Sequence, residues 1–284
     1  MSDALLRRWL RRAPAYGVLA LCAAVLLFPL YVTFANSLHP IAEFLQDPPP
    51  SLFPSDPRWG NYFAGGDEQG GSGGPGVTRY LFNSVVVAGI ITIGQLVTST
   101  LAAYAFAFLR FPGRGVLFAL FLATMMVPLE VAVIPNFQTI QWLHWTDSYQ
   151  GLVAPFLATG FGTFLLRQYF LTIPSELKDA AEMDGYGEYR FLLHVAVPLA
   201  GGALATLAVF AFLQAWNQYL WPLLVTNDPD LRTVQIGIGA ETQEPFRINI
   251  AFANTIIAFL PMVLLVIAFQ RSLVRGLFGG SVKG

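Results

Sequence analysis

Six apolar stretches, each about as long as a membrane-crossing helix, constrain this chain more than any other feature. A helix needs about 20 mostly apolar residues to cross the hydrocarbon core of a bilayer. The composition agrees, because 55% of the residues are hydrophobic and only 12% are charged, about half the charged fraction of an ordinary soluble domain. We therefore predict an all-α membrane protein, a six-helix transmembrane bundle. The predicted spans lie near Tyr16–Asn36, Tyr80–Leu109, Gly115–Ile134, Gly151–Tyr169, Pro198–Leu224 and Ala251–Gln270.

The distribution of basic residues predicts the orientation of this bundle. Six spans place both termini on one side, and cytoplasmic segments of membrane proteins are enriched in Lys and Arg. With both termini inside, twelve of the sixteen Lys and Arg residues fall on the cytoplasmic side, and the other four are Arg58, Arg79, Arg232 and Arg247. We expect a cytoplasmic N-terminus at 1–15, a six-span domain at 16–271 with an outer loop at 37–78 and a cytoplasmic loop at 172–197, and a cytoplasmic tail at 272–284.

Three local patterns add detail to the predicted architecture. The outer loop is rich in proline and glycine, which predicts extended chain and turns followed by a flexible linker. On the second span, Ser99, Ala103 and Ala107 recur at every fourth position, and such small residues let helices approach closely. Pro128, Pro155 and Pro261 are expected to kink their helices.

Most enzyme chemistry has no support in the sequence. There is no phosphate-binding G-x-x-x-x-G-K-[ST] motif and no H-E-x-x-H zinc motif, so we predict no nucleotide, metal or other cofactor in this chain. The single cysteine, Cys22, cannot form an internal disulfide. A net charge of −1 gives no reason to expect a nucleic-acid partner.

A few polar residues within the spans are candidates for a solute pathway. Glu130 is the one acidic residue that falls inside a predicted span, and acids there commonly mark pathways or inter-helix pairing. The fifth span carries a compact polar and aromatic cluster, made of Trp216, Asn217, Gln218 and Tyr219. Such a cluster suits a hydroxylated solute. It also suits an aromatic belt at the membrane interface, and exposure at the interface is equally open for Glu130.

The segment from Ser175 to Leu199 is the most distinctive polar part of the chain. It holds five of the 17 acidic residues, between two long apolar stretches and on the predicted cytoplasmic side. Ser175 is a good N-cap, and Gly185 and Gly187 are expected to end a first helix before a second begins. The pattern predicts helix, turn, helix along the membrane surface. It fits either an amphipathic connector or a docking element for a cytoplasmic partner.

The sequence "DAAEMDGYGEYRFLLHVAVPL" within this segment resembles the EAA coupling loop of permease subunits in bacterial ATP-binding-cassette (ABC) importers. The family pattern is Glu-Ala-Ala, three residues, Gly and then a hydrophobic stretch. Here Asp179 replaces the usual Glu, and Gly185 stands at the glycine position. Nearly the whole chain is similar to the carbohydrate branch of that family. "AWNQYLWPLLVTN", "PLEVAVIP" and "TDSYQGL" look closest to the second permease subunit of glycerol-3-phosphate importers, and the tail "QRSLVRGLFGGSVKG" to that of the maltose type.

The resemblance implies a function and a set of partners. Such a permease pairs with a second, different permease subunit in the bacterial inner membrane, on two ATPase subunits that hydrolyse ATP, and receives its solute from an extracytoplasmic binding protein. The expected solute is a sugar, a polyol or sn-glycerol-3-phosphate. By position, the residues expected to contact an ATPase subunit are Asp179, Ala180, Ala181, Asp184 and Gly185.

Two other functions are compatible with a polytopic membrane protein. A self-sufficient ion-coupled transporter would carry solute alone, but it would be expected to have several acids inside its spans. A membrane anchor for a cytoplasmic complex would leave Glu130 and the cluster at 216–219 without a task. The coupling-loop resemblance favours the importer over both.

Overall fold

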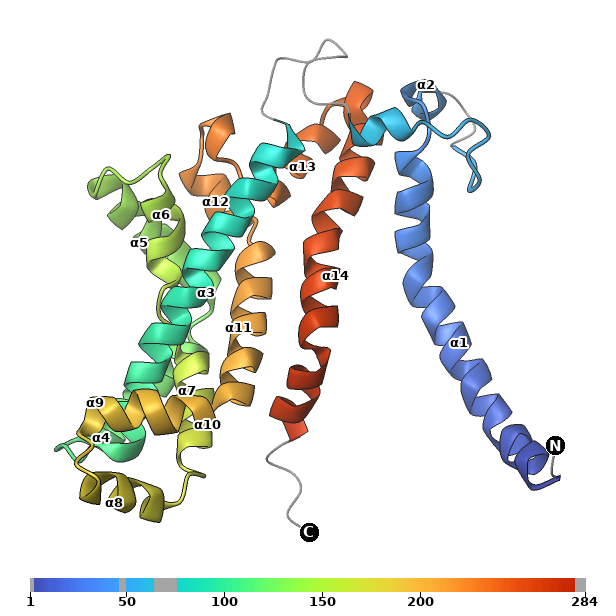
Figure 1. Ribbon diagram of the computed structural model, residues 1–284. Coiled ribbons are helices and arrows are strands. Elements are labelled where there is room, and N and C mark those ends of the chain that lie inside the picture. Colours follow the sequence, from blue (N-terminus) through green and yellow to red (C-terminus); the bar gives the residue numbers. More distant parts are fainter. Residues whose placement is uncertain (1–2, 46–49, 64–75, 279–284) are drawn as a thin grey trace. The chain divides into compact units, whose positions relative to one another are not determined.

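The computed structural model describes residues 3–45, 50–63 and 76–278, and its regular secondary structure within those ranges is helical. The chain divides into two compact units (Figure 1). The first comprises residues 1–71 and 238–259, and the second comprises residues 72–237 and 260–284.

Three of the described helices are individually long and apolar enough to cross a membrane. They are the Pro14–Ser37 part of α1 (Asp3–Ser37), all of α3 (Val77–Phe108), and the Ile248–Gln270 part of α14 (Ile248–Phe278). Three more candidates are pairs of helices that meet the same criterion together but are bent by 98°, 45° and 79°. The pairs are Arg114–Met126 with Glu130–Trp142, Tyr149–Phe156 with Gly160–Phe170, and Glu188–Leu199 with Gly201–Trp216. The described helices thus allow from three to six crossings, so the six-span layout stays a prediction.

The third apolar stretch is interrupted at Pro128, where the sequence predicts a kink. Helix α4 (Arg114–Ala123) runs into the 3₁₀ turn η2 (Thr124–Met126), and α5 (Leu129–Trp142) starts again after Pro128. Pro128 has extended backbone angles at the N-cap of α5; proline has no backbone N–H to continue the helix. Pro155 likewise lies at the bend of the second pair, in η3 (Ala154–Phe156), whereas Pro261 lies inside an uninterrupted α14.

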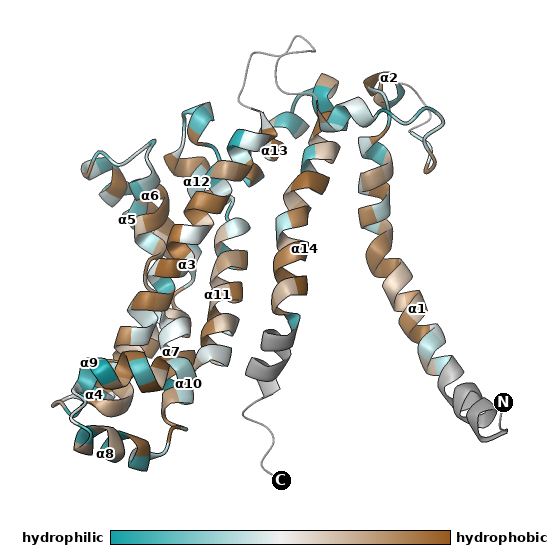
Figure 2. Cartoon of the chain, viewed as in Figure 1, coloured by the Kyte–Doolittle hydropathy of each residue, from teal (hydrophilic) through white to brown (hydrophobic). Residues whose placement is uncertain are grey.

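The second unit is built around α3, against which α7 (Gly160–Phe170) and α11 (Gly201–Trp216) pack (Figure 1). Ser99 and Ala103 on α3 are fully buried, as the small-residue spacing predicts. Helices α3 and α7 approach closely at Gly162 on α7, since this residue has no side chain. A Cβ atom there would lie 2.5 Å from the Ser99 hydroxyl oxygen. These packed helices are predominantly hydrophobic along their length (Figure 2).

The opposite ends of α3 contact different parts of the second unit. The short helices α8 (Ser175–Met183), α9 (Glu188–Phe191) and α10 (Val197–Leu199) lie at its C-terminal end, whereas α6 (Tyr149–Val153), α12 (Leu220–Val225) and the turn η5 (Pro229–Leu231) lie toward its N-terminal end (Figure 1). There the Asn83 amide donates to the carbonyls of Asp230 (2.8 Å) and Arg232 (2.9 Å) and accepts from the Tyr149 hydroxyl (2.7 Å). One buried amide therefore joins three segments far apart in the sequence.

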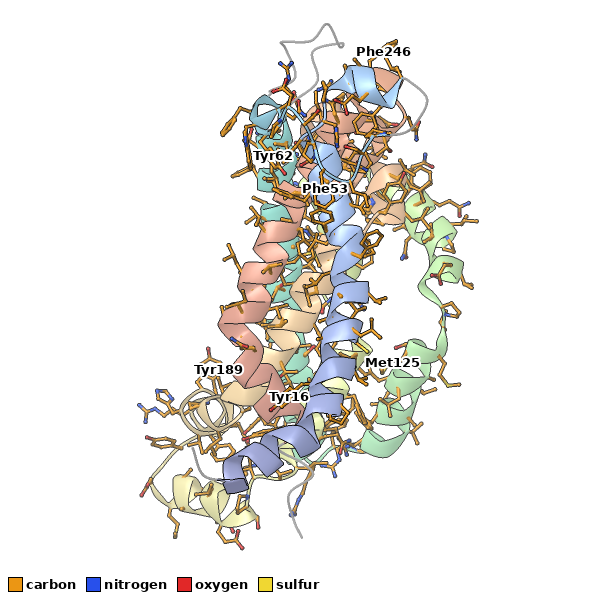
Figure 3. The ribbon with its side chains drawn as sticks, turned by 90° about the vertical axis from the view of Figure 1, so that its right-hand side faces the viewer. Tyr16, Phe53, Tyr62, Met125, Tyr189 and Phe246 are labelled. Carbon is orange, nitrogen blue, oxygen red and sulfur yellow. The ribbon has the colours of Figure 1, made fainter. Side chains whose placement is uncertain are left out.

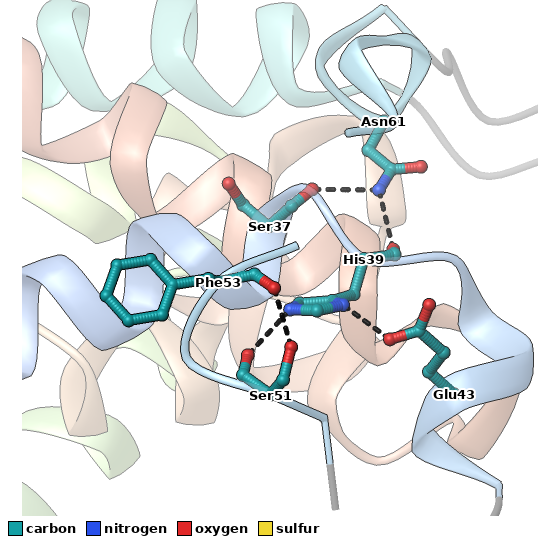
Figure 4. Close-up of polar contacts among 6 residues, drawn as sticks. All are labelled: Ser37, His39, Glu43, Ser51, Phe53 and Asn61. Atoms are coloured by element: carbon teal, nitrogen blue, oxygen red, sulfur yellow. Dashed lines mark hydrogen bonds and ion pairs between the residues drawn. The ribbon is translucent and has the colours of Figure 1, made fainter. Parts of the chain in front are cut away.

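The first unit contains an ordered part of the predicted outer loop. After α1, the chain forms α2 (Ile41–Phe44) and η1 (Trp59–Tyr62). The buried His39 ring lies 2.6 Å from the Glu43 carboxylate and 2.9 Å from the Ser51 carbonyl, while the Asn61 amide donates to the Ser37 and His39 carbonyls (Figure 4). Residues 50–58 contain bends and no helix, in agreement with the predicted extended chain and turns. The hydrogen bonds of His39, Ser51 and Asn61 hold residues 37–45 and 50–63 together. The predicted glycine-rich linker falls at 64–75, outside the described residues.

Candidate functional site

The segment that resembles the coupling loop folds as the helix, turn and helix predicted for it. Pro174, not Ser175, occupies the N-cap of α8, so Ser175 begins the helix without capping it. Proline restricts its own φ at the entry to the helix, but its side chain accepts no hydrogen bond from the first turn. The helix ends where Gly185 takes a φ of +79°. The Gly185 N–H donates to Glu182 (3.0 Å) and the Tyr186 N–H to Ala181 (2.8 Å), which is the Schellman closure that favours glycine.

One side of α8 is packed onto the helix bundle. Ala181 is 7% exposed and belongs to a buried cluster with Tyr104, Phe170 and Phe191. Phe108 contributes a T-shaped contact with Phe191, with ring centroids 5.4 Å apart. Alanine is small enough to let the helix backbone approach these rings. Ala181 is therefore covered by its own chain.

A polar link joins α8 and α9 to α3 beside this cluster. The Lys178 ammonium lies 2.9 Å from the Glu188 carboxylate, and the Tyr104 hydroxyl donates a short hydrogen bond to the other carboxylate oxygen. Lys178 also lies over the Phe108 ring, 5.9 Å from its centroid. Hydrogen bonds to charged groups are stronger than neutral ones. The link thus fixes both short helices to the C-terminal end of α3.

The other side of α8 and the start of α9 are open. Asp179, Ala180, Asp184 and Gly185 are all exposed, so four of the five predicted coupling residues share a free surface. Apolar side chains lie on the same segment, because Leu177 is 42%, Met183 84% and Tyr189 71% exposed. Figure 3 labels Tyr189. We call Leu177, Asp179, Ala180, Met183, Asp184 and Tyr189 the coupling surface. It combines the carboxylates of Asp179 and Asp184 with exposed apolar side chains.

A cavity of about 140 Å³ lies near the other end of the second unit and brings together three of the predicted pathway residues. Glu130 comes from the first turn of α5, and Gln218 and Tyr219 come from the break between α11 and α12. The remaining wall is mainly apolar. It consists of Val133, Asn136, Phe156, Leu220 and Trp221.

The cavity holds polar groups that have no partner within the described chain. The buried Oε1 atom of Gln218 accepts no hydrogen bond, and leaving such an acceptor unpaired costs about 1–3 kcal/mol. The exposed Glu130 makes no ion pair with any described residue. Trp221 is fixed by a hydrogen bond from its Nε1 to the Gly151 carbonyl (3.1 Å) and by an edge contact with Phe156. The cavity therefore has a rigid aromatic wall and free acceptors.

The predicted cluster at 216–219 is divided by the end of α11. Trp216 is 1% exposed and stacks on Phe212, with ring centroids 5.5 Å apart. Asn217 is exposed and donates to the Leu213 carbonyl (2.8 Å). Neither residue lines the cavity. A helix turns about 100° per residue, so four consecutive residues at a helix end cannot all face one site.

Sequence reasoning missed the polar link between Tyr104, Lys178 and Glu188. Tyr104 is separated from Glu188 by 84 residues, and a tyrosine inside an apolar stretch carries no local mark of such a contact. The one local signal is Lys178, which stands three residues after Ser175, where a capping-box acid would stand if Ser175 were the N-cap.

Comparison with known proteins places the chain in a family. Residues 95–279 match the family model described as "Binding-protein-dependent transport system inner membrane component". The chain belongs to that family. It is a multi-pass component of the inner membrane, as predicted.

Relatives match along nearly the whole chain. The sn-glycerol-3-phosphate transport system permease protein UgpE of Agrobacterium fabrum is 40% identical over 278 residues, which cover 95% of this chain and 97% of the relative. The proteins of that name from Brucella abortus and Yersinia enterocolitica are each 39% identical, over 92% and 89% of this chain.

The fold matches a solved transporter. A chain of a bacterial ABC transporter involved in the import of the acidic polysaccharide alginate superposes with a TM-score of 0.75, over 95% of this chain and 98% of that chain, at 22% identity. The predicted fold class, an all-α permease of the ABC importer type, is thereby confirmed.

Proposed function

We propose that this chain is the transmembrane permease subunit of an ATP-driven importer for a carbohydrate or polyol-type solute. Family membership, the relatives named as sn-glycerol-3-phosphate permeases and the permease fold all support this function. The solute class extends from sugars to sn-glycerol-3-phosphate.

The observation that carries the coupling role is the geometry of α8. One side is fixed to α3 through Ala181, Lys178 and Glu188, and the other presents the coupling surface. A rigid helix held in this way transmits displacement to the bundle, because packed interfaces deform little. ATPase subunits that move the coupling surface would therefore move α3.

The proposed partners follow from this role. Two ATPase subunits bind and hydrolyse ATP, a second permease subunit completes the pathway, and an extracytoplasmic protein delivers the solute. This chain itself needs no cofactor and catalyses no reaction. Its acidic Asp179 and Asp184 would meet basic groups on the ATPase, while Ala180 permits close approach.

The cavity is the proposed part of the solute pathway in this chain. Glu130, Gln218 and Tyr219 supply hydrogen-bonding groups beside aromatic rings, as binding sites for sugars and polyols require. Trp216 and Asn217 support the surrounding helix end instead.

Purification of the tagged chain from its own membranes in mild detergent tests the assembly. We expect an ATPase and a second permease to accompany it in stoichiometric amounts, and the Ala180→Arg variant to lose the ATPase but keep the second permease. A chain that is active in transport and yet comes alone would refute the proposal and favour gradient-driven transport.

A further inference from the structure

Two arginines lie close together at the end of the second unit that also carries the coupling surface (Figure 1). Arg114 is the first residue of α4, and Arg167 lies in the last turn of α7, which packs against α4. The two guanidinium groups are close enough to repel each other. Neither forms an ion pair with any residue that the structure describes. Two like charges are therefore held together without a counter-charge.

Contacts within the chain hold both guanidinium groups in position. The Nη1 of Arg114 donates to the Leu109 carbonyl (3.0 Å), and the Nε of Arg167 donates to the Phe106 carbonyl (3.2 Å). The Arg167 guanidinium also lies over the Phe118 ring, 4.0 Å from its centroid. A guanidinium carries five N–H donors, and both arginines are only half-buried. Each therefore keeps donors that a ligand can reach.

A phosphate group matches this pair of arginines. Its oxygens accept hydrogen bonds from guanidinium groups, often two at once, and its negative charge offsets the repulsion between the two cations. The chain belongs to a family of inner-membrane components, so phospholipid head groups lie next to the ends of its membrane helices. Basic groups between such helices are typical binding places for anionic lipid head groups.

Helix α4 has one packed aromatic face and one bare aliphatic face. On the packed face, the Phe118 ring lies 5.3 Å from the Phe106 ring, centroid to centroid. On the bare face, Val116 is 67%, Leu117 50% and Leu120 60% exposed. These aliphatic residues follow within two turns of the arginine that begins the helix. Acyl chains attached to the bound phosphate would cover this face and remove its apolar surface from water.

We propose that Arg114 and Arg167 bind the head-group phosphate of one anionic phospholipid, whose acyl chains lie along the aliphatic face of α4. The charge of the head group decides the class of lipid. Phosphatidylethanolamine also carries a phosphate, but its ammonium group would meet the two cations. Phosphatidylglycerol has no such group. The site goes beyond the proposed importer function, because it requires the membrane and neither a solute nor an ATPase.

Native mass spectrometry of the full chain tests this site. The chain is purified in mild detergent and mixed with equal amounts of phosphatidylglycerol and phosphatidylethanolamine that carry the same acyl chains. We expect the chain to retain phosphatidylglycerol with about a tenfold preference, the effect of one hydrogen bond to a charged group. Arg167→Gln should bring the two lipids close to parity. Arg167→Lys keeps the charge but loses the planar donor group, so it should lower the preference only several-fold.

A matched control separates this site from the general charge of the protein. Arg190→Gln makes the same change at an exposed arginine of the coupling segment, which lies over the Tyr186 ring, 5.7 Å from its centroid. We expect its lipid preference to equal that of the wild type. If Arg167→Gln and Arg190→Gln lower the preference equally, or neither lowers it, the assignment to Arg114 and Arg167 is wrong. Should Arg167→Gln fail to fold, the comparison of Arg167→Lys with Arg190→Gln decides the question.

Two other occupants of the site give different results. An excess of inorganic phosphate should leave phosphatidylglycerol bound, and Leu120→Asn on the aliphatic face should reduce its retention several-fold, because the acyl chains contribute to binding. Displacement by inorganic phosphate together with no effect of Leu120→Asn would assign the site to a free anion and overturn the proposal. Loss of the ATPase in Arg167→Gln with unchanged lipid preference would identify an ATPase contact and also overturn it. Lipid retention needs no partner subunit, so the result is independent of the copurification test.

Discussion

At the scale of single residues, the glycines at positions 185 and 187 differ in backbone conformation. Gly185 has a φ of +79°, whereas Gly187 has an ordinary extended conformation with a φ of −78°. A Cβ atom would meet nothing within 4 Å at either position, so backbone strain alone distinguishes them.

Gly185→Ala should therefore weaken the turn after α8, while Gly187→Ala should not. The left-handed conformation costs an L-residue about 1–2 kcal/mol. We expect Gly185→Ala and, more strongly, Gly185→Val to insert normally but to retain several-fold less ATPase on copurification. Hydrogen exchange in 181–187 checks the local cause. Equal behaviour of the alanine variants at positions 185 and 187 would contradict this account.

The Asp147 carboxylate joins two loops, the one after α5 and the one after α12, through hydrogen bonds that depend on its charge. Its carboxylate accepts from the backbone N–H groups of Asn227 (2.5 Å) and Asp228 (2.8 Å). The hydrogen bond from the Asp228 N–H is the main cause that holds the pKa of Asp147 below its ordinary value of 3.8. Partial burial raises the pKa, and the backbone and side-chain amides of Asn227 lower it further.

A depressed pKa stabilises the folded form above the ordinary value of 3.8, and the stabilisation is lost as pH falls through the lower, folded-state value. Asp147→Asn removes this titration. We expect the melting temperature of the wild type to exceed that of the variant at neutral pH, and the difference to shrink as pH falls from about 6 to about 3. If the difference in melting temperature is constant over that pH range, protonation of Asp147 does not contribute to stability.

At the scale of elements, the two alanines of α8 separate docking from folding. Ala180 is exposed, and Ala181 is 7% exposed against the aromatic cluster. Ala180→Arg should keep the wild-type melting temperature and lose ATPase binding, whereas Ala181→Arg should lower the melting temperature, because it buries a charge. Asp179→Glu should be nearly silent, since it restores the usual family residue. Thermal melts and copurification of the three variants check these outcomes.

The link between α3 and the coupling segment should matter for transmission. Tyr104→Phe removes the hydroxyl that donates to Glu188 and leaves the ring among Phe108, Phe170 and Phe191. We expect ATPase binding to persist while solute uptake per ATP hydrolysed falls by about tenfold or more, because one hydrogen bond to a charged group contributes about 1.5–3 kcal/mol. The control is Tyr169→Phe, which also removes one hydroxyl, the donor to the Leu199 carbonyl (2.6 Å), and leaves the link between Tyr104, Lys178 and Glu188 intact. If solute uptake per ATP hydrolysed is unchanged in Tyr104→Phe, the hydrogen bond between Tyr104 and Glu188 does not contribute to transmission.

At the scale of the whole molecule, the sequence predicted the features that depend on local pattern. Apolar stretches predicted helices, the 99–107 spacing predicted close packing on α3, and the glycines at 185 and 187 predicted the turn after α8. Pro128 predicted a kink in the third stretch, but the sequence does not report the size of a bend, so the 98° angle there was not predicted. The Tyr104–Glu188 hydrogen bond and the shared cavity of Glu130 and Gln218 depend on packing between segments that are distant in the sequence. A single sequence carries no local signal for such packing.

The central claim is that ATP hydrolysis by partner subunits, acting through the coupling surface, drives import. The most direct test is solute uptake into right-side-out vesicles that contain the full complex and trapped ATP, with the Ala180→Arg variant in parallel. We predict uptake that requires ATP, survives a protonophore and is lost in Ala180→Arg. Uptake that continues without ATP and collapses with the protonophore would contradict the account.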